Sequence, residues 1–137
     1  MKIVIDTNVF IAGLLKDSIV RDMLLSENIE FFLPKYAITE VEKYRKELCD
    51  KAGLTDEEFN TIFDHLLTKI NLISDEEIKP YIEKATELIG NRDSKDVPFI
   101  ATALAINSDG IWSFDKHFRK QKEIKIFNTA EIADFYQ

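Results

Sequence analysis

Four acidic residues lie where apolar segments of the sequence begin or end. Asp6 and Asp115 each follow a short apolar run, while Glu40 lies early in an amphipathic segment and Asp96 precedes a long apolar run. Carboxylates brought together repel one another, and each is driven toward its protonated form unless a cation lies between them. Hard divalent cations prefer oxygen ligands, whereas zinc favours His and Cys. With 1 Cys and 2 His in the chain, this set of acids favours Mg²⁺ or Mn²⁺ over zinc.

The first stretch of the chain shows how such an acid is positioned. The run Lys2 to Ile5 is short, apolar and β-branched, which is typical of a buried strand of a parallel sheet. Three polar residues, Asp6, Thr7 and Asn8, arrive where this strand leaves the core. In open α/β sheets, ligands bind at the carboxyl edge of the strands. We therefore expect the end of this strand to belong to a functional site.

Strand and helix patterns alternate along the rest of the sequence. Further strands are predicted at residues 30–33, 71–74, 111–114 and 125–127, and helices at 9–15, 18–26, 36–49, 55–67, 76–89, 97–106 and 129–136. The alternation predicts an α/β fold, a three-layer α/β/α sandwich with a central parallel sheet of about five strands. No linker interrupts the pattern, so we expect one domain over residues 1–137. On such a sheet, all four acids fall on the same rim.

The composition restricts the partners and the compartment. Asp and Glu outnumber Lys and Arg by 25 to 18, and the net charge of -7 argues against broad, non-specific binding to nucleic acid. A polyanionic partner would require bound metal ions or a clustered basic patch. The sequence shows no signal peptide and no apolar run of membrane-spanning length, and Cys49 is its single cysteine. We expect a soluble, cytoplasmic protein without a membrane partner.

Four segments together resemble the successive motifs of the PIN domain family. They are Ile5-Asp6-Thr7-Asn8, Ile38-Thr39-Glu40-Val41, Asp96 followed by Phe99-Ile100-Ala101-Thr102-Ala103-Leu104, and Trp112-Ser113-Phe114-Asp115-Lys116-His117-Phe118. The resemblance spans nearly the whole chain in the right order and spacing. PIN domains are metal-dependent ribonucleases and include the toxins of bacterial and archaeal toxin–antitoxin pairs. The resemblance thus implies RNA cleavage with Mg²⁺ or Mn²⁺, and an antitoxin as a candidate partner.

The resemblance also implies roles for individual residues. The metal-binding and catalytic acids would be Asp6, Glu40, Asp96 and Asp115. Asn8 and Ser113 would be polar supports that position these acids. Many members of the family carry a further acid two residues beyond the last one, where this sequence has His117. Asp93 is a candidate to compensate for that difference, while His117 is expected to be a surface or capping residue.

Basic residues border the last two motifs. They are Lys95, Lys116, Arg119, Lys120 and Lys122. Near the same rim they would contact the phosphates of an RNA substrate. The alternative is that they form an ordinary solvated face.

Each acid also has a structural interpretation. Asp6, Asp96 and Asp115 are residue types that cap helices or turns, and Glu40 lies among other charged residues of a helix. Two other functions stay open as well. One is a non-catalytic, PIN-like RNA-binding domain, and the other is a magnesium-binding signalling domain of the receiver type.

An apparent surplus of large apolar side chains predicts a homodimer. The residues are Phe31, Phe32, Tyr36, Phe59, Ile62, Phe63, Leu66 and Leu67. Apolar surface that a small domain cannot bury usually forms an interface. The alternative is that these side chains all pack internally.

Overall fold

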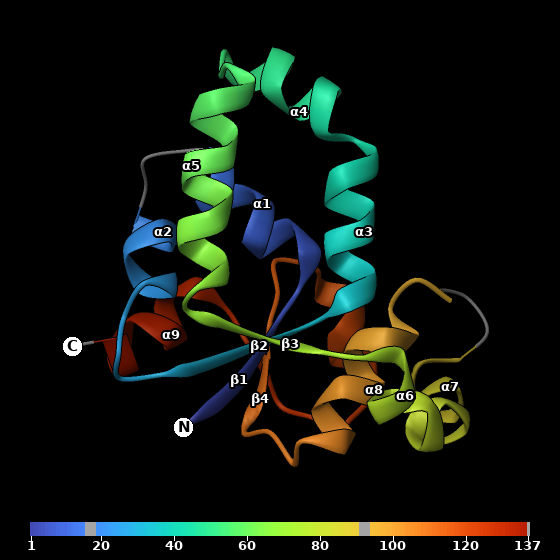
Figure 1. Cartoon of the computed structure of the whole chain (residues 1–137). Coiled ribbons are helices and arrows are strands. Elements are labelled where there is room, and N and C mark those ends of the chain that lie inside the picture. The colour runs from blue at the N-terminus through green and yellow to red at the C-terminus, as the bar shows by residue number, and fades with distance from the viewer. Residues whose placement is uncertain (16–18, 91–93, 137) are drawn as a thin grey trace.

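The computed structural model describes residues 1–15, 19–90 and 94–136, and its centre is a parallel sheet (Figure 1). Within these residues the strands are β1 (Lys2–Ile5), β2 (Glu30–Pro34), β3 (Ile70–Ile73), β4 (Gly110–Trp112) and β5 (Ile126–Phe127). All neighbouring strands are parallel, in the order β3-β2-β1-β4-β5. The predicted α/β fold with a central parallel sheet is confirmed.

The strand order excludes one of the alternatives left open by the sequence, the receiver-type signalling domain. Receiver-type domains have the order 2-1-3-4-5, whereas here the chain builds outward from β1 to β3 and then returns to place β4 on the other side of β1. The receiver interpretation is therefore wrong. The reversal also defines a topological switch point between β1 and β4, and in open α/β sheets ligands bind in the crevice at such a point.

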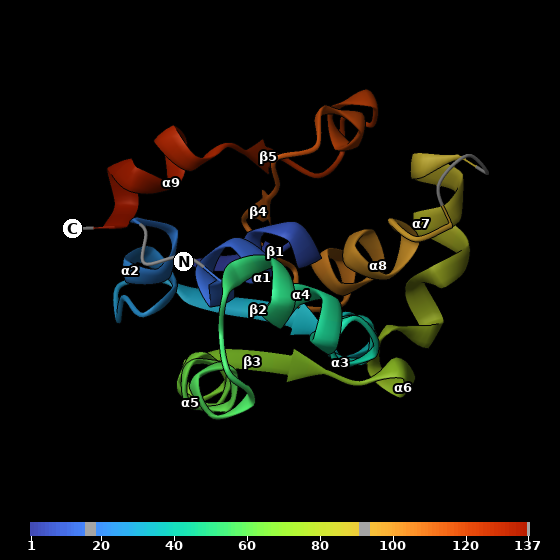
Figure 2. The same ribbon diagram turned by 90° about the horizontal axis from the view of Figure 1, so that it is seen from above.

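Helices cover both faces of the sheet. They are α1 (Thr7–Leu15), α2 (Ile19–Leu24), α3 (Lys35–Lys43), α4 (Arg45–Ala52), α5 (Asp56–Leu67), α6 (Asp75–Ile78), α7 (Ile82–Ile89), α8 (Val97–Ala105) and α9 (Thr129–Tyr136), with 3-10 turns η1 (Lys79–Tyr81) and η2 (Lys116–Lys120). Helix α8 packs on β1, β2 and β4, with α6 and α7 beyond it, while α1 contacts α2 and α5 on the other side. Figure 2 shows α7 and α8 well separated from α2 and α9.

Two predicted helices are each divided in the structure. The predicted helix 36–49 breaks at Tyr44 into α3 and α4, although no Gly or Pro lies there. Beyond the break, the Arg45 guanidinium lies 4.4 Å from the centre of the Phe59 ring on α5, so a contact between helices accompanies the turn. The predicted helix 76–89 is divided around η1, where Pro80 cannot continue an α-helix.

The core absorbs half of the apolar surplus assigned to a dimer. Phe31, Phe59, Phe63 and Leu66 are buried, and Phe59 stacks on Phe63 with ring centres 5.6 Å apart. For these residues the inference from apolar surplus was wrong, because they pack inside the protein. Phe32, Tyr36, Ile62 and Leu67 are only half-buried. Within the described residues, no helix combines the length and apolar character needed to cross a membrane.

Candidate functional site

A cleft of about 330 Å³ opens beside the switch point, and all four predicted acids line it. Asp6 comes from the β1–α1 junction, Glu40 from α3, Asp96 from the residue before α8, and Asp115 from the segment after β4. Asn8 and Lys95 line the same cleft, together with Thr7, Ile11, Val41, Tyr44, Leu48 and Phe99. The fold thus brings together acids from four separate segments of the chain, as expected for the carboxyl edge of a parallel sheet.

Asp6 is the buried member of this set, with 7% of its surface exposed. Its main-chain N–H donates to the Trp112 carbonyl at 3.1 Å, and its Oδ2 accepts a hydrogen bond from Ser113 Oγ at 2.9 Å. Burial raises the pKa of Asp6, and the nearby carboxylates of Asp115 and Glu40 raise it further, whereas hydrogen bonds from Ser113 and the Thr7 amide oppose the change. The site therefore holds one carboxyl group that is costly to ionise without a compensating positive charge.

Glu40 is half-buried on α3 and faces the start of α1. Thr7 Oγ1 donates to Glu40 Oε1 at 3.5 Å, a long contact between two segments 33 residues apart. Burial raises the pKa of the Tyr36 phenol, and the Glu40 carboxylate one helical turn away adds to the effect. The sequence placed Thr7 at the same strand end as Asp6 but gave it no role, and it did not assign Tyr36 to the site. For Tyr36 the signal was present, since residues four apart on a helix are neighbours.

Asp96 does not cap α8 with its side chain. Its carbonyl oxygen accepts from the N–H groups of Phe99 and Ile100, but its carboxylate makes no capping hydrogen bond to the first turn of the helix. The capping interpretation therefore does not account for this carboxylate, which lines the cleft beside Lys95.

Asp115 has the predicted capping role and also lines the acidic cleft. Its Oδ1 accepts from the His117 N–H at 2.8 Å and so caps η2, as the structural interpretation expected, while the residue also lines the acidic cleft. His117 Nδ1 lies 2.8 Å from the same oxygen, and the imidazole is largely exposed. Ser113 Oγ accepts from the Asp115 N–H at 2.9 Å while donating to Asp6. One hydroxyl group thereby ties the two acids together across the switch point.

Three of the five predicted basic residues line two neighbouring cavities. Lys95 lines the acidic cleft, whereas Lys116 and Arg119 line a second cavity that shares Asp115 with it. Lys120 and Lys122 are exposed and are not among the residues that line either cavity. Asp93, predicted as a compensating acid, lies outside the described residues.

The four acids line one cleft, but their carboxylates are not arranged around a common point. In the part of the chain that the structure describes, no three Asp, Glu, His or Cys side chains are arranged to hold a metal ion together. The chemistry of the lining nevertheless suits a hard cation, because it offers carboxylate, amide and hydroxyl oxygens.

Comparisons with known proteins give one family and one fold. Residues 4–132 match the sequence profile of the PIN domain. Among solved structures, the chain is similar to a chain in the crystal structure of VapBC2 from Rickettsia felis bound to a DNA fragment from their promoter. The TM-score is 0.68 at 18% identity, covering 93% of this chain and 98% of the other. A search of curated protein sequences gave no match.

The raised pKa of Asp6 predicts a stability effect that can be measured without metal. Its folded-state pKa lies above the ordinary value of 3.8, so ionisation of Asp6 lowers the free energy of unfolding as pH rises through that folded-state pKa. In chelator, Asp6→Asn should therefore melt at a higher temperature than the wild type at neutral pH. The difference should shrink as pH falls toward 3.8, where the wild-type carboxyl group becomes protonated.

Thermal melts between acidic and neutral pH check this expectation. Asp64→Asn, which removes an exposed carboxylate on α5, is the matched control and should change the free energy of unfolding by less than about 0.5 kcal/mol. A lower melting temperature for Asp6→Asn at neutral pH would contradict the inference that the charge of Asp6 destabilises the folded protein.

Proposed function

The chain belongs to the PIN domain family, and from this premise we propose that it is an endoribonuclease that uses Mg²⁺ or Mn²⁺ to hydrolyse RNA phosphodiester bonds. The observation that carries the proposal is the single cleft lined by Asp6, Glu40, Asp96 and Asp115. A cleft rich in carboxylates repels a polyanion unless cations lie between the two. The same acids that would hold the cations thus explain why the cations are needed.

The four acids would hold the metal, with Asn8 and Ser113 as supports. Ser113 fixes the carboxylate of Asp6 and the backbone of Asp115, and Thr7 restrains Glu40. Such supporting contacts orient ligands and tune their basicity. The raised pKa of Asp6 supports the assignment, since a divalent cation relieves the repulsion that contributes to it.

Hydrolysis at phosphorus requires a metal ion held in the cleft, a group that accepts the proton of the attacking water, and a cation beside the phosphate. A divalent ion held by the four acids would supply Lewis acidity to a phosphate oxygen and would lower the pKa of bound water. The carboxylates themselves do not attack; they hold charge in place, and one of them accepts the proton from the attacking water. Lys95, which lines the cleft beside Asp96, offers an ammonium group to a phosphate oxygen of the substrate. As the water oxygen bonds to phosphorus, the bond from phosphorus to the 3′ oxygen breaks, and the 3′ oxygen takes up a proton from solvent.

We extend the proposal to a toxin of a toxin–antitoxin pair in the cytoplasm. The extension rests on the family, which includes such toxins, and on the similarity of fold to a chain of the VapBC2 structure. A small open reading frame immediately upstream would be the expected source of the antitoxin. A non-catalytic, RNA-binding PIN domain is the alternative, and the presence of all four acids in the cleft argues against it.

The first functional prediction concerns cleavage. The purified protein should cleave single-stranded RNA in Mg²⁺ or Mn²⁺ and lose this activity in excess chelator. Asp6→Asn keeps the size of the side chain but removes the charge, so activity should fall by more than about 100-fold, beyond the loss typical of supporting residues. A gel assay of labelled RNA measures both effects, with Asp64→Asn as the control. Full activity in chelator would refute the metal assignment.

The second prediction has a readout that does not depend on activity. If the cleft binds a divalent ion, Mg²⁺ or Mn²⁺ should raise the stability of the folded protein by linkage, about 2.7 kcal/mol at a concentration one hundred times the dissociation constant. Thermal melts against metal concentration measure the effect. The melting temperature of the double variant Asp6→Asn/Asp96→Asn should not change with metal. If the melting temperature of the wild type also does not change with either ion, the proposed metal site is wrong.

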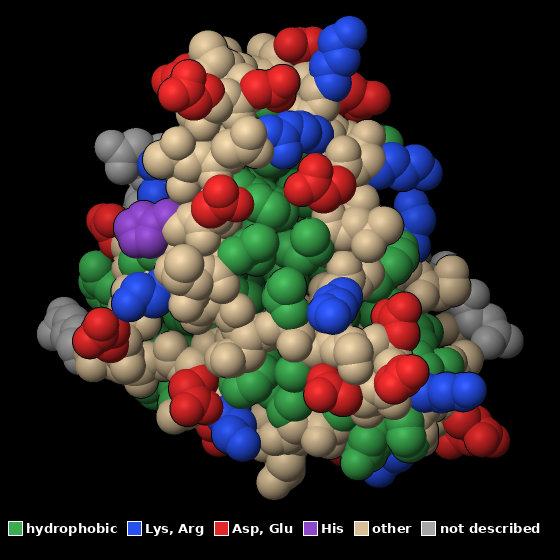
Figure 3. All heavy atoms as spheres, viewed as in Figure 1, with side chains coloured by type: hydrophobic (Ala, Val, Ile, Leu, Met, Phe, Trp, Pro, Cys, Tyr) green, Lys and Arg blue, Asp and Glu red, His purple; other side chains and the backbone are tan. Residues whose placement is uncertain are grey.

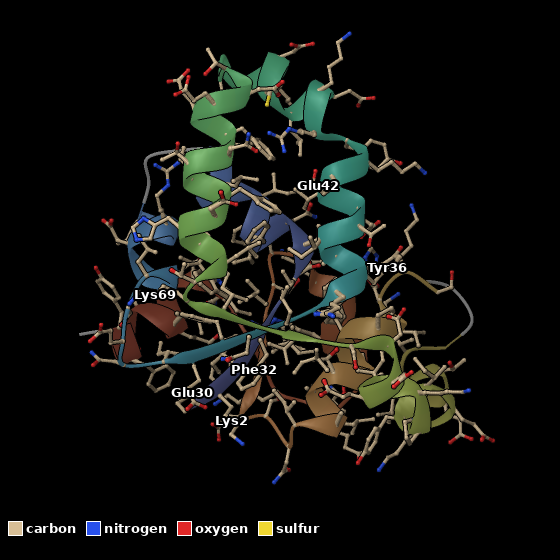
Figure 4. The ribbon with its side chains drawn as sticks, in the orientation of Figure 1. Lys2, Glu30, Phe32, Tyr36, Glu42 and Lys69 are labelled. Atoms are coloured by element: carbon tan, nitrogen blue, oxygen red, sulfur yellow. The ribbon has the colours of Figure 1, made fainter. Side chains whose placement is uncertain are left out.

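We also propose that the protein forms a homodimer. Half-buried apolar side chains remain on α3, α5 and the neighbouring strands, among them Phe32 and Tyr36, whose positions are labelled in Figure 4. Figure 3 shows apolar side chains gathered between α3 and α5, framed by acidic and basic ones. Strand β3 lies at an edge of the sheet beside them. An apolar centre with a charged rim is the usual composition of a protein interface.

Light scattering over a dilution series tests the dimer. We expect twice the monomer mass of 15.9 kDa at micromolar concentration, and the same mass at high salt, because apolar contacts are not screened by ions. A monomer mass throughout the series would overturn the proposal.

A further inference from the structure

A second cavity lies beside the acidic cleft, and apart from Ser113 and Asp115 its lining residues have no role in the chemistry described above. Its volume is about 930 Å³, and it lies between the segment after β4 and the first residues of α9. The lining residues are Ser113, Phe114, Asp115, Lys116, Arg119, Asn128, Thr129, Ala130 and Glu131. We call this cavity the β4–β5 groove, because the segments that line it come directly after these two strands in the chain. Cavities of roughly 300–1,000 Å³ are typical of sites for small organic groups.

Phe114 is the unusual residue of this groove. About half of its surface, 48%, is exposed, although its neighbours Trp112 and Ser113 are buried. A single exposed apolar side chain is ordinary, but Phe114 is more exposed than the other large aromatic side chains of the described residues, and it lines a cavity. Aromatic side chains beside cations are how proteins hold unpaired bases and the phosphates between them.

The charges of the groove suit a nucleic-acid strand. Lys116 and Arg119 supply two cations, against the carboxylates of Asp115 and Glu131. Arg119 lies 3.3 Å from Glu131, but both side chains are well exposed, and such pairs contribute little. A phosphate can therefore replace Glu131 as the partner of the Arg119 guanidinium. Asp115 already accepts from His117 and lines the acidic cleft.

We propose that the β4–β5 groove binds an unpaired nucleotide next to the bond to be cleaved, with its base stacked on Phe114. The inference rests on the proposed ribonuclease function and adds to it a position that binds one base of the substrate. Continuity supports it, because Asp115 lines both cavities and a strand with its phosphate at the acids passes directly into the groove. Lys116 and Arg119 contact the phosphate of the stacked nucleotide. A paired base has no free face to offer, so duplex RNA cannot use the groove in this way.

A fluorescence assay in the Asp6→Asn variant tests the inference, since it measures binding without cleavage. The probe is a short single-stranded oligoribonucleotide with 2-aminopurine placed at successive positions, in Mg²⁺. Stacking on Phe114 should quench the probe at one position in the strand. Adding Phe114→Leu should abolish the quenching and weaken binding roughly 5- to 150-fold, the range expected for loss of one stacked base. Adding Phe114→Trp should preserve both signals, because the aromatic face is kept.

Two controls give the outcomes their meaning. Phe135→Leu alters another exposed phenylalanine, 38% exposed on α9 and outside the groove, and should change neither signal. The same probe annealed into a duplex should show no quenching. Unchanged affinity and quenching in Phe114→Leu would overturn the groove, even where the wild type cleaves RNA. Failure of the wild type to cleave would instead overturn the ribonuclease function, and the binding assay would still decide the groove.

Discussion

The parallel pairing of β1 with β4 is the constraint on which the candidate site depends. The register places Ile5 opposite Trp112, and the Asp6 N–H continues the ladder by donating to the Trp112 carbonyl. The residue after Trp112 is Ser113, whose hydroxyl therefore falls within reach of the Asp6 carboxylate. The indole of Trp112 in turn donates to Thr129 Oγ1 at the start of α9. A shift of register by one residue would turn these side chains to the opposite face of the sheet.

This arrangement places a carboxyl group where its burial lowers the stability of the fold. Asp6 is buried at the end of a central strand, where apolar residues would be more favourable, and two neighbouring carboxylates raise the cost of its charge. Natural proteins commonly tolerate such unfavourable groups where function requires them. The large apolar core behind the site, including the fully buried Ile3, Val4 and Ile5 of the same strand, offsets that cost.

Features encoded locally could be predicted from the sequence. The strand of β1, the apolar helix α8 and the capping box of Thr55 and Glu58 all follow from neighbouring residues, and all are present. The placement of the four acids in one cleft followed from the general rule for parallel sheets. Contacts between distant segments could not be predicted in the same way. The break at Tyr44 accompanies packing of Arg45 on Phe59, and the contact of Thr7 with Glu40 depends on how α1 and α3 meet.

Burial was the other quantity that the sequence left open. Phe59 and Phe63 have the periodicity of one apolar helix face, and periodicity does not say whether that face meets a partner subunit or another helix. In the structure Phe63 meets Phe10 of α1 edge to face, with ring centres 5.9 Å apart. An aromatic cluster inside the domain therefore replaces the interface that the composition suggested for these residues.

The distribution of charge explains how an acidic protein can present a surface to a polyanion. The net charge of -7 is a property of the whole chain, whereas a substrate meets only local potentials, since salt screens charges beyond about 10 Å. Lys95 in the acidic cleft, and Lys116 and Arg119 in the β4–β5 groove, lie within the two cavities themselves. Asp115 lies between the cavities, where its N–H donates to Ser113 Oγ and its carboxylate accepts from the His117 N–H of η2. Because the short segment after β4 forms walls of both cavities, local structure would set the distance between a phosphate at the acids and a base in the groove if both bind as proposed.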